Sequence, residues 1–138
     1  MKANKKGFTL IELLAVIVIL AIIALIATPI ILNVINDAKE NASKSSAYGY
    51  LESVEKYIAL SGASISSYNA PIPADGTTCT IADGVSSDCK DFIDAVNATA
   101  KGEKPKSASL TISGGMVTGT IEMPSHSTVW TYNGTELS

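Results

Sequence analysis

Residues Gly7 to Leu32 have the sequence GFTLIELLAVIVILAIIALIATPIIL, and this apolar stretch decides the fold. From residue 8 onward its polar side chains are those of Thr9, Glu12 and Thr28. A helix over residues 8–32 would be about 37 Å long, which exceeds the ~30 Å hydrocarbon core of a bilayer. The stretch therefore predicts a membrane-spanning helix.

The flanking charges predict how this helix lies in a membrane. Lys2, Lys5 and Lys6 precede the helix, and the segment after it carries both signs of charge. By the positive-inside rule, we expect the first residues in the cytoplasm and everything beyond about Asn33 outside. A secretory signal peptide is the alternative. It is disfavoured because the apolar run is too long and no A-x-A-like cleavage site follows it.

Glu12 is out of place in a simple membrane anchor. A carboxylate costs about 2.5–3.5 kcal/mol at the centre of an inserted helix and less near its end, where the side chain can extend to the interface. However, the segment KKGFTLIE at residues 5–12, followed by a long apolar helix, resembles the amino terminus of type IV prepilins and related pseudopilins. This resemblance covers residues 5 to about 35.

The resemblance implies a processing reaction and a division of the chain. In that family a membrane peptidase on the cytoplasmic side cleaves after the glycine and methylates the new terminal amine. Here cleavage would fall between Gly7 and Phe8, Phe8 would be N-methylated, and Glu12 would become the fifth residue of the mature chain. We expect a leader peptide at 1–7, a transmembrane and filament-core helix at 8–32, and an exported headgroup at 33–138.

The helix is predicted to run from near Phe8 to about Leu60, where Ser61-Gly62 provides a cap. Pro29 removes one backbone hydrogen bond and predicts a kink, which pilins usually have at the matching position. Many pilins have a second proline near the position that Gly49 occupies. This chain has no proline there, so the sequence does not predict a second kink.

The second half of this helix is predicted to be amphipathic. Apolar residues recur there at spacings of mostly three to five, which places them on one narrow stripe. Glu40–Lys44 and Glu52–Lys56 are pairs whose spacing supports a helix. The predicted stripe consists of Ile35, Ala38, Ala42, Ala47, Leu51, Val54 and Ile58.

The rest of the chain predicts a small α+β headgroup. Residues 61–87 are rich in Ser, Gly, Asp and Pro and indicate a loop, with a possible short strand at 79–81. Residues 88–100 predict a second helix capped by Ser87 or Asp88. A lysine cluster at 101–106, which includes Lys106, indicates a solvated linker. Strands are predicted at 109–112, 116–123 and 128–132, with a short fourth at 135–137. We therefore expect a long helix packed on a small antiparallel sheet of three or four strands, as in pilin headgroups.

Cys79 and Cys89 are the two cysteines of the chain, and both lie in the predicted exported part. In an oxidising compartment we expect them to form a disulfide that joins the loop to the second helix. Free thiols are the alternative. A metal site needs more soft ligands than two Cys and one His supply, so we expect none.

The sequence offers few other groups for chemistry. His126, between two serines, is expected in a surface loop. The segment 83–88, DGVSSD, has oxygens that could surround Ca²⁺, as in some pseudopilins, but Asp-Gly turns are much commoner. Nucleophile-elbow, zinc-protease and phosphate-loop motifs are absent from the sequence. A net charge of −3 without arginine argues against tight binding of nucleic acid.

These features predict a structural subunit rather than an enzyme, with no catalytic residues and no cofactor. The expected product is a type IV pilus-like filament on the outside of the cell. The prepilin peptidase would cleave and N-methylate each copy of the chain, and an assembly machinery would pack the copies through their apolar helices. A pseudopilin of a secretion or DNA-uptake machine is the runner-up. A membrane-anchored exported enzyme or sensor is the alternative from a different class, and it would leave Glu12 without a role.

Overall fold

The structure is a computed structural model that describes residues 6–63 and 65–138. It divides into two compact units, Met1–Ala38 and Lys39–Ser138. Most of the predicted leader lies outside the described residues, which include only Lys6 and Gly7 of it.

One helix of 52 residues, α1 (Leu10–Ser61), contributes to both units. Its bounds confirm the predicted helix to within two residues at each end. Pro29 lies inside α1 without ending it. Just before it, the Thr28 hydroxyl donates a hydrogen bond of 2.6 Å to the carbonyl oxygen of Ala24. Such a bond from a helical threonine to the preceding turn often accompanies helix bending.

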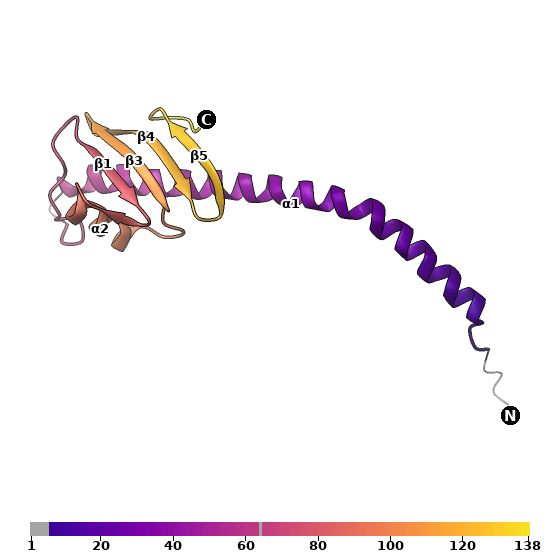
Figure 1. The fold of residues 1–138 in the computed structure, drawn as a ribbon. Coiled ribbons are helices and arrows are strands. Elements are labelled where there is room, and N and C mark those ends of the chain that lie inside the picture. Colours follow the sequence, from indigo (N-terminus) through magenta and orange to yellow (C-terminus); the bar gives the residue numbers. More distant parts are fainter. Residues whose placement is uncertain (1–5, 64) are drawn as a thin grey trace, which may run out of the picture. The chain divides into compact units, whose positions relative to one another are not determined.

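The second unit contains a five-stranded antiparallel sheet in the order β2-β1-β3-β4-β5. The sheet lies against the C-terminal part of α1 (Figure 1). The α+β fold class is therefore confirmed, with one strand more than predicted. The strands are β1 (Thr78–Ala82), β2 (Val85–Ser86), β3 (Ser107–Ser113), β4 (Met116–Met123) and β5 (His126–Tyr132).

Local turn chemistry explains most of these strands. Gly114 and Gly115 both have positive φ, and they connect β3 to β4 as predicted. The Asp83-Gly84 turn connects β1 to β2, so this part of the predicted loop belongs to the sheet. The predicted fourth strand at 135–137 is reduced to a single bridge between Tyr132 and Leu137.

The second helix, α2 (Lys90–Thr99), begins later than predicted. Neither Ser87 nor Asp88 is its N-cap. That position is taken by Cys89, whose side chain makes no capping hydrogen bond. The Asp88 carboxylate instead accepts a hydrogen bond from the Thr80 hydroxyl. The longer-range contact with β1 therefore replaces the local cap.

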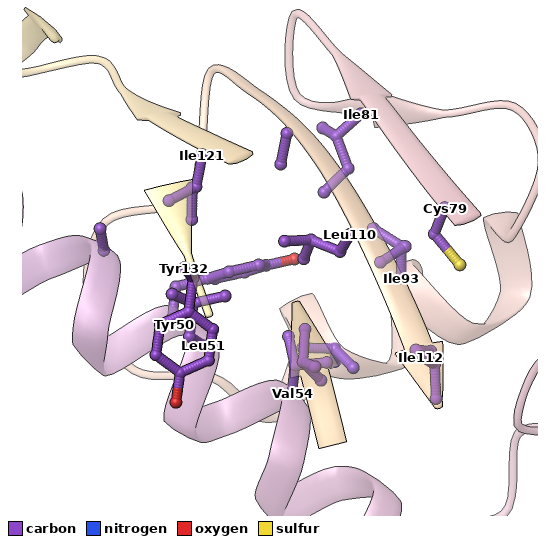
Figure 2. Close-up of a cluster of buried hydrophobic side chains, with 14 of the residues drawn as sticks. Tyr50, Leu51, Val54, Cys79, Ile81, Ile93, Leu110, Ile112, Ile121 and Tyr132 are labelled. Carbon is purple, nitrogen blue, oxygen red and sulfur yellow. The ribbon is translucent and has the colours of Figure 1, made fainter. Parts of the chain in front are cut away.

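The core of the second unit lies between α1, α2 and the inner face of the sheet (Figure 2). The predicted stripe on α1 is partly wrong. Ala47, Leu51 and Val54 are buried, but Ile35, Ala38 and Ala42 are exposed. Polar-tipped residues take part instead, since Ser43, Tyr50 and Tyr57 are also buried on this face of α1.

The buried polar groups on α1 have partners far along the chain. Trp130 Nε1 donates to Ser43 Oγ at 3.1 Å, and Tyr50 Oη donates to Asn97 Oδ1 at 3.0 Å. The backbone N–H of Ala70 donates to the Tyr57 hydroxyl at 3.0 Å. Burial also raises the pKa of Tyr50. Because each buried polar atom is satisfied, this face of α1 can hold the sheet, α2 and the following loop together.

Two ion pairs occur among residues 6–63 and 65–138, and neither is one that the sequence predicted. Lys90 pairs with Asp94 within α2, and Lys106, directly before β3, pairs with Glu122 of β4. Lys106 is exposed, as predicted for the lysine cluster, but this ion pair and its backbone N–H, which donates to the Glu122 carbonyl oxygen at 2.9 Å, connect it to β4. The predicted Glu40–Lys44 pair is not formed, since Lys44 Nζ lies 5.3 Å from the centre of the Trp130 ring.

Candidate processing and assembly segment

The predicted cleavage site lies just before α1, in a segment without secondary structure. Residues 6–9 are not helical, and α1 begins at Leu10. Gly7 is exposed, and 94% of the Phe8 surface is exposed. A peptide bond in an exposed, non-helical segment is accessible to a peptidase. The structure thus places Gly7 and Phe8 together at an accessible position.

Thr9 and Glu12 form a reciprocal capping box at the start of α1. The backbone N–H of Thr9 donates to Glu12 Oε2 at 3.0 Å, and the backbone N–H of Glu12 donates to Thr9 Oγ1 at 3.3 Å. This arrangement satisfies two of the N–H groups that a helix leaves free at its N-terminus. Sequence reasoning assigned no role to Thr9. The signal was present, because a threonine three residues before a glutamate is the sequence signature of such a box.

The apolar part of α1 is exposed along its length. Large apolar side chains from Leu10 to Leu32 are each 49–88% exposed. Exposed apolar surface of this extent marks a membrane segment or a protein interface. By length and composition, α1 is the one helix of the described residues that could cross a membrane.

Comparison with known proteins agrees with this geometry. Residues 2–28 match the family model described as the prokaryotic N-terminal methylation motif. The chain carries the type IV prepilin-type signal. This prepilin-type signal covers the predicted cleavage segment, the capping box and most of the apolar helix, and it supports a type IV pilin-like or pseudopilin precursor. Together with the apolar helix it fits a membrane-anchored precursor.

The match ends before the headgroup. Neither the curated proteins nor the solved structures give a match to the chain. The likeness to known proteins is therefore limited to the prepilin-type signal at residues 2–28, and the headgroup is characterised by its own structure.

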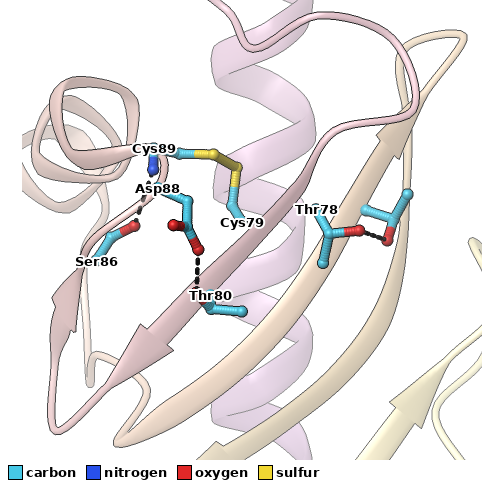
Figure 3. Close-up of a disulfide and its surroundings, with 7 residues drawn as sticks. Thr78, Cys79, Thr80, Ser86, Asp88 and Cys89 are labelled. Atoms are coloured by element: carbon cyan, nitrogen blue, oxygen red, sulfur yellow. Dashed lines mark hydrogen bonds between the residues drawn. A yellow bond between two sulfur atoms is a disulfide. The ribbon is translucent and has the colours of Figure 1, made fainter.

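A second candidate site is the disulfide between Cys79 in β1 and Cys89 before α2 (Figure 3). The two residues are ten positions apart in sequence, and their Cα atoms are 5.4 Å apart. Cys79 is fully buried and Cys89 is 7% exposed. The Cys89 N–H also donates to Ser86 Oγ at 3.3 Å. The disulfide thus connects the sheet to the start of α2.

Cys79→Ser is expected to destabilise the headgroup by roughly 3 kcal/mol, because a closed loop of this size no longer restricts the unfolded chain. Urea unfolding of the full chain in detergent, followed by Trp130 fluorescence, measures this loss. Reductant should destabilise the wild type to the same extent and leave the variant unchanged. Two thiols titrating in the unfolded, unreduced wild type would contradict the prediction.

The other two candidates from the sequence, His126 and the possible calcium segment at 83–88, take part in the secondary structure of the headgroup. His126 begins β5 and is half-buried, with Nδ1 2.7 Å from Thr128 Oγ1, so the prediction of a surface loop was wrong. Asp83 and Gly84, from the possible calcium segment, form the β1–β2 turn. Within residues 6–63 and 65–138, no group of three or more His, Cys, Asp or Glu side chains could hold a metal ion.

Proposed function

We propose that this chain is a structural subunit of a type IV pilus-like filament. The observation that carries the proposal is the exposed apolar length of α1, most of which lies, with Glu12, inside the prepilin-type signal. In the membrane, lipid covers this surface. In a filament, the same surface of neighbouring subunits would cover it, so a single helix serves as anchor and as assembly core.

The proposed processing creates a charge next to Glu12. Cleavage between Gly7 and Phe8 leaves a positive amine on Phe8, at the edge of the apolar segment. Within one chain, Phe8 and Glu12 would lie four residues apart on a continuous helix, where the amine and the carboxylate could pair. Phe8 precedes the first helical residue, and the Glu12 carboxylate accepts a hydrogen bond from Thr9 instead. This arrangement favours a pair between the Glu12 of one subunit and the amine of its neighbour.

A pair between subunits would determine how they align. Sliding one helix along another by a turn leaves apolar packing almost unchanged, but it separates the two charges. A buried unpaired charge costs several kcal/mol, whereas a pair recovers much of that cost. Glu12 would therefore set the axial register of the filament.

The proposed partners follow from this mechanism. They are the prepilin peptidase, an assembly machinery in the membrane and other copies of the chain. The precursor would lie in the membrane with its N-terminus in the cytoplasm, and the assembled subunit would lie outside the cell. We propose no cofactor, no catalytic role and no specific nucleic acid for this subunit.

The runner-up is a pseudopilin that forms a short fibre in a secretion or DNA-uptake machine, for which the same segment would serve. Shearing of cells followed by electron microscopy distinguishes the two. Long surface filaments that contain this chain support a pilus, whereas release of short or no filaments favours a pseudopilin. An anchored enzyme or sensor would remain with the membrane fraction, with residues 1–7 still attached.

Mass spectrometry of the surface-exposed protein is expected to find an N-terminus at N-methyl-Phe8. Gly7→Val should leave the precursor uncleaved in the membrane, because a peptidase that cuts after glycine has little room for a branched side chain. The same exchange at exposed Gly62, where a Cβ would meet nothing within 4 Å, is the matched control and should be processed normally. A surface form that retains Met1 would refute the proposed processing.

A further inference from the structure

The outer face of the sheet carries two rows of hydroxyl groups. Strand register places Thr78, Thr111 and Thr118 side by side across β1, β3 and β4. A second row crosses four strands and consists of Thr80, Ser109, Thr120 and Thr131. These seven residues, here named the hydroxyl face, alternate along the strands with residues of the core such as Cys79 and Leu110. Neighbouring strands lie about 4.8 Å apart, so the hydroxyls form a close two-dimensional array.

The seven side chains of the hydroxyl face are uncharged, and Glu122, which follows Thr118 and Thr120 on the same side of β4, lies at its margin. The carboxylates at its margins are already engaged. Asp88 accepts a hydrogen bond from Thr80, and Glu122 accepts from Ser107 at 2.9 Å and from Lys106 at 3.2 Å. These bonds lower the pKa of Glu122, the bond from Ser107 contributing most. A charged partner would gain little attraction from such a surface.

A hollow of about 230 Å³ opens on this face over β1, β3 and β4. Its polar lining consists of Thr80, Ser109 and Thr120 of the hydroxyl face together with Ser107 and Glu122, whose side chains are hydrogen-bonded to each other, and Val129 of β5 adds an apolar side chain. The hydroxyls of Ser109 and Thr120 make no side-chain hydrogen bond within the described part of the protein, so they are free to donate and accept. The hollow is smaller than the pockets of drug-sized ligands and suits a single sugar ring.

We propose that the hydroxyl face binds a neutral polysaccharide, with one sugar ring in this hollow. Sugar hydroxyls, like those of Thr and Ser, both donate and accept hydrogen bonds, so the two surfaces are chemically matched. A protein partner would instead favour an apolar interface core, which the seven polar residues of the hydroxyl face do not supply. Each contact is weak. A surface that presents many copies of the chain would bind through avidity, and the proposed filament is one such surface.

The test uses the purified full chain in detergent, coupled to beads at high density, and therefore does not depend on filament formation. Retention of two soluble neutral probes, hydroxyethyl cellulose and dextran, is compared with that of anionic alginate, at low and high salt. We expect at least one neutral probe to bind, alginate to bind less, and salt to have little effect. Ser109→Ala and Thr120→Val should each weaken binding about fivefold, the effect of one lost hydrogen bond.

Thr135→Val, at an exposed position in the turn after β5, is the matched control and should bind like the wild type. Unfolding followed by Trp130 fluorescence verifies that each variant is folded, and an unfolded variant is replaced by Thr118→Val. Three results would each overturn the proposal: no retention of either neutral probe, equal binding by the face variants and the control, or binding abolished by salt. Failure of filament assembly would leave this result unchanged.

Discussion

Glu12→Ala is expected to abolish filament formation while cleavage at Gly7 continues. Removing one partner of a buried ion pair costs about 3–5 kcal/mol, which is more than roughly a hundredfold in each assembly step. Cleavage should continue because the Thr9 hydroxyl can still cap the backbone N–H of residue 12. Filament yield after shearing, measured beside the fraction of processed protein, separates the two effects.

Two further variants distinguish charge from helix capping. Glu12→Gln keeps the length of the side chain and the capping-box acceptor but removes the charge, so it should fail in assembly like Glu12→Ala. Glu12→Asp keeps the charge on a chain one methylene shorter and should be intermediate at best. Normal filament yield from Glu12→Ala, with normal processing, would show that the carboxylate does not govern assembly.

Gly119→Ala is expected to unfold the headgroup. Gly119 lies in the middle of β4 with φ of +143°, paired with Leu110 on one side and Tyr132 on the other. A Cβ at this position would lie 1.9 Å from the carbonyl oxygen of Ser109, a backbone atom that cannot move without breaking the sheet. We expect the free energy of unfolding to fall by at least about 4 kcal/mol, because a steric clash with the backbone is among the few defects that cause so large a loss. Trp130 fluorescence during urea unfolding measures it.

The matched control is Gly49→Ala, the same exchange on the exposed side of α1. A Cβ at Gly49 would meet nothing within 4 Å, and alanine favours the helix by about 1 kcal/mol. This variant should therefore be slightly more stable than the wild type. A Gly119→Ala variant with wild-type stability would mean that β3 and β4 are not paired closely at this point.

The sequence alone was sufficient for the features that depend on local pattern. The apolar stretch and KKGFTLIE predicted the prepilin-type signal, which the family model confirms at residues 2–28. The 3.6-residue period and the Ser61-Gly62 cap predicted α1, and the paired glycines predicted the turn between β3 and β4. Each of these signals lies within a few residues of the feature that it specifies.

Tertiary structure decided which residues of α1 are buried and what lies opposite them. Ser43 is buried because its hydroxyl accepts a bond from Trp130, 87 positions away. Tyr50 is buried opposite Asn97, and no periodicity in α1 indicates that partner. Likewise, Asp88 does not cap α2 as predicted, because its carboxylate accepts a hydrogen bond from the Thr80 hydroxyl of β1. A polar group can be buried only where a partner satisfies it, and that partner is known only once distant segments have come together.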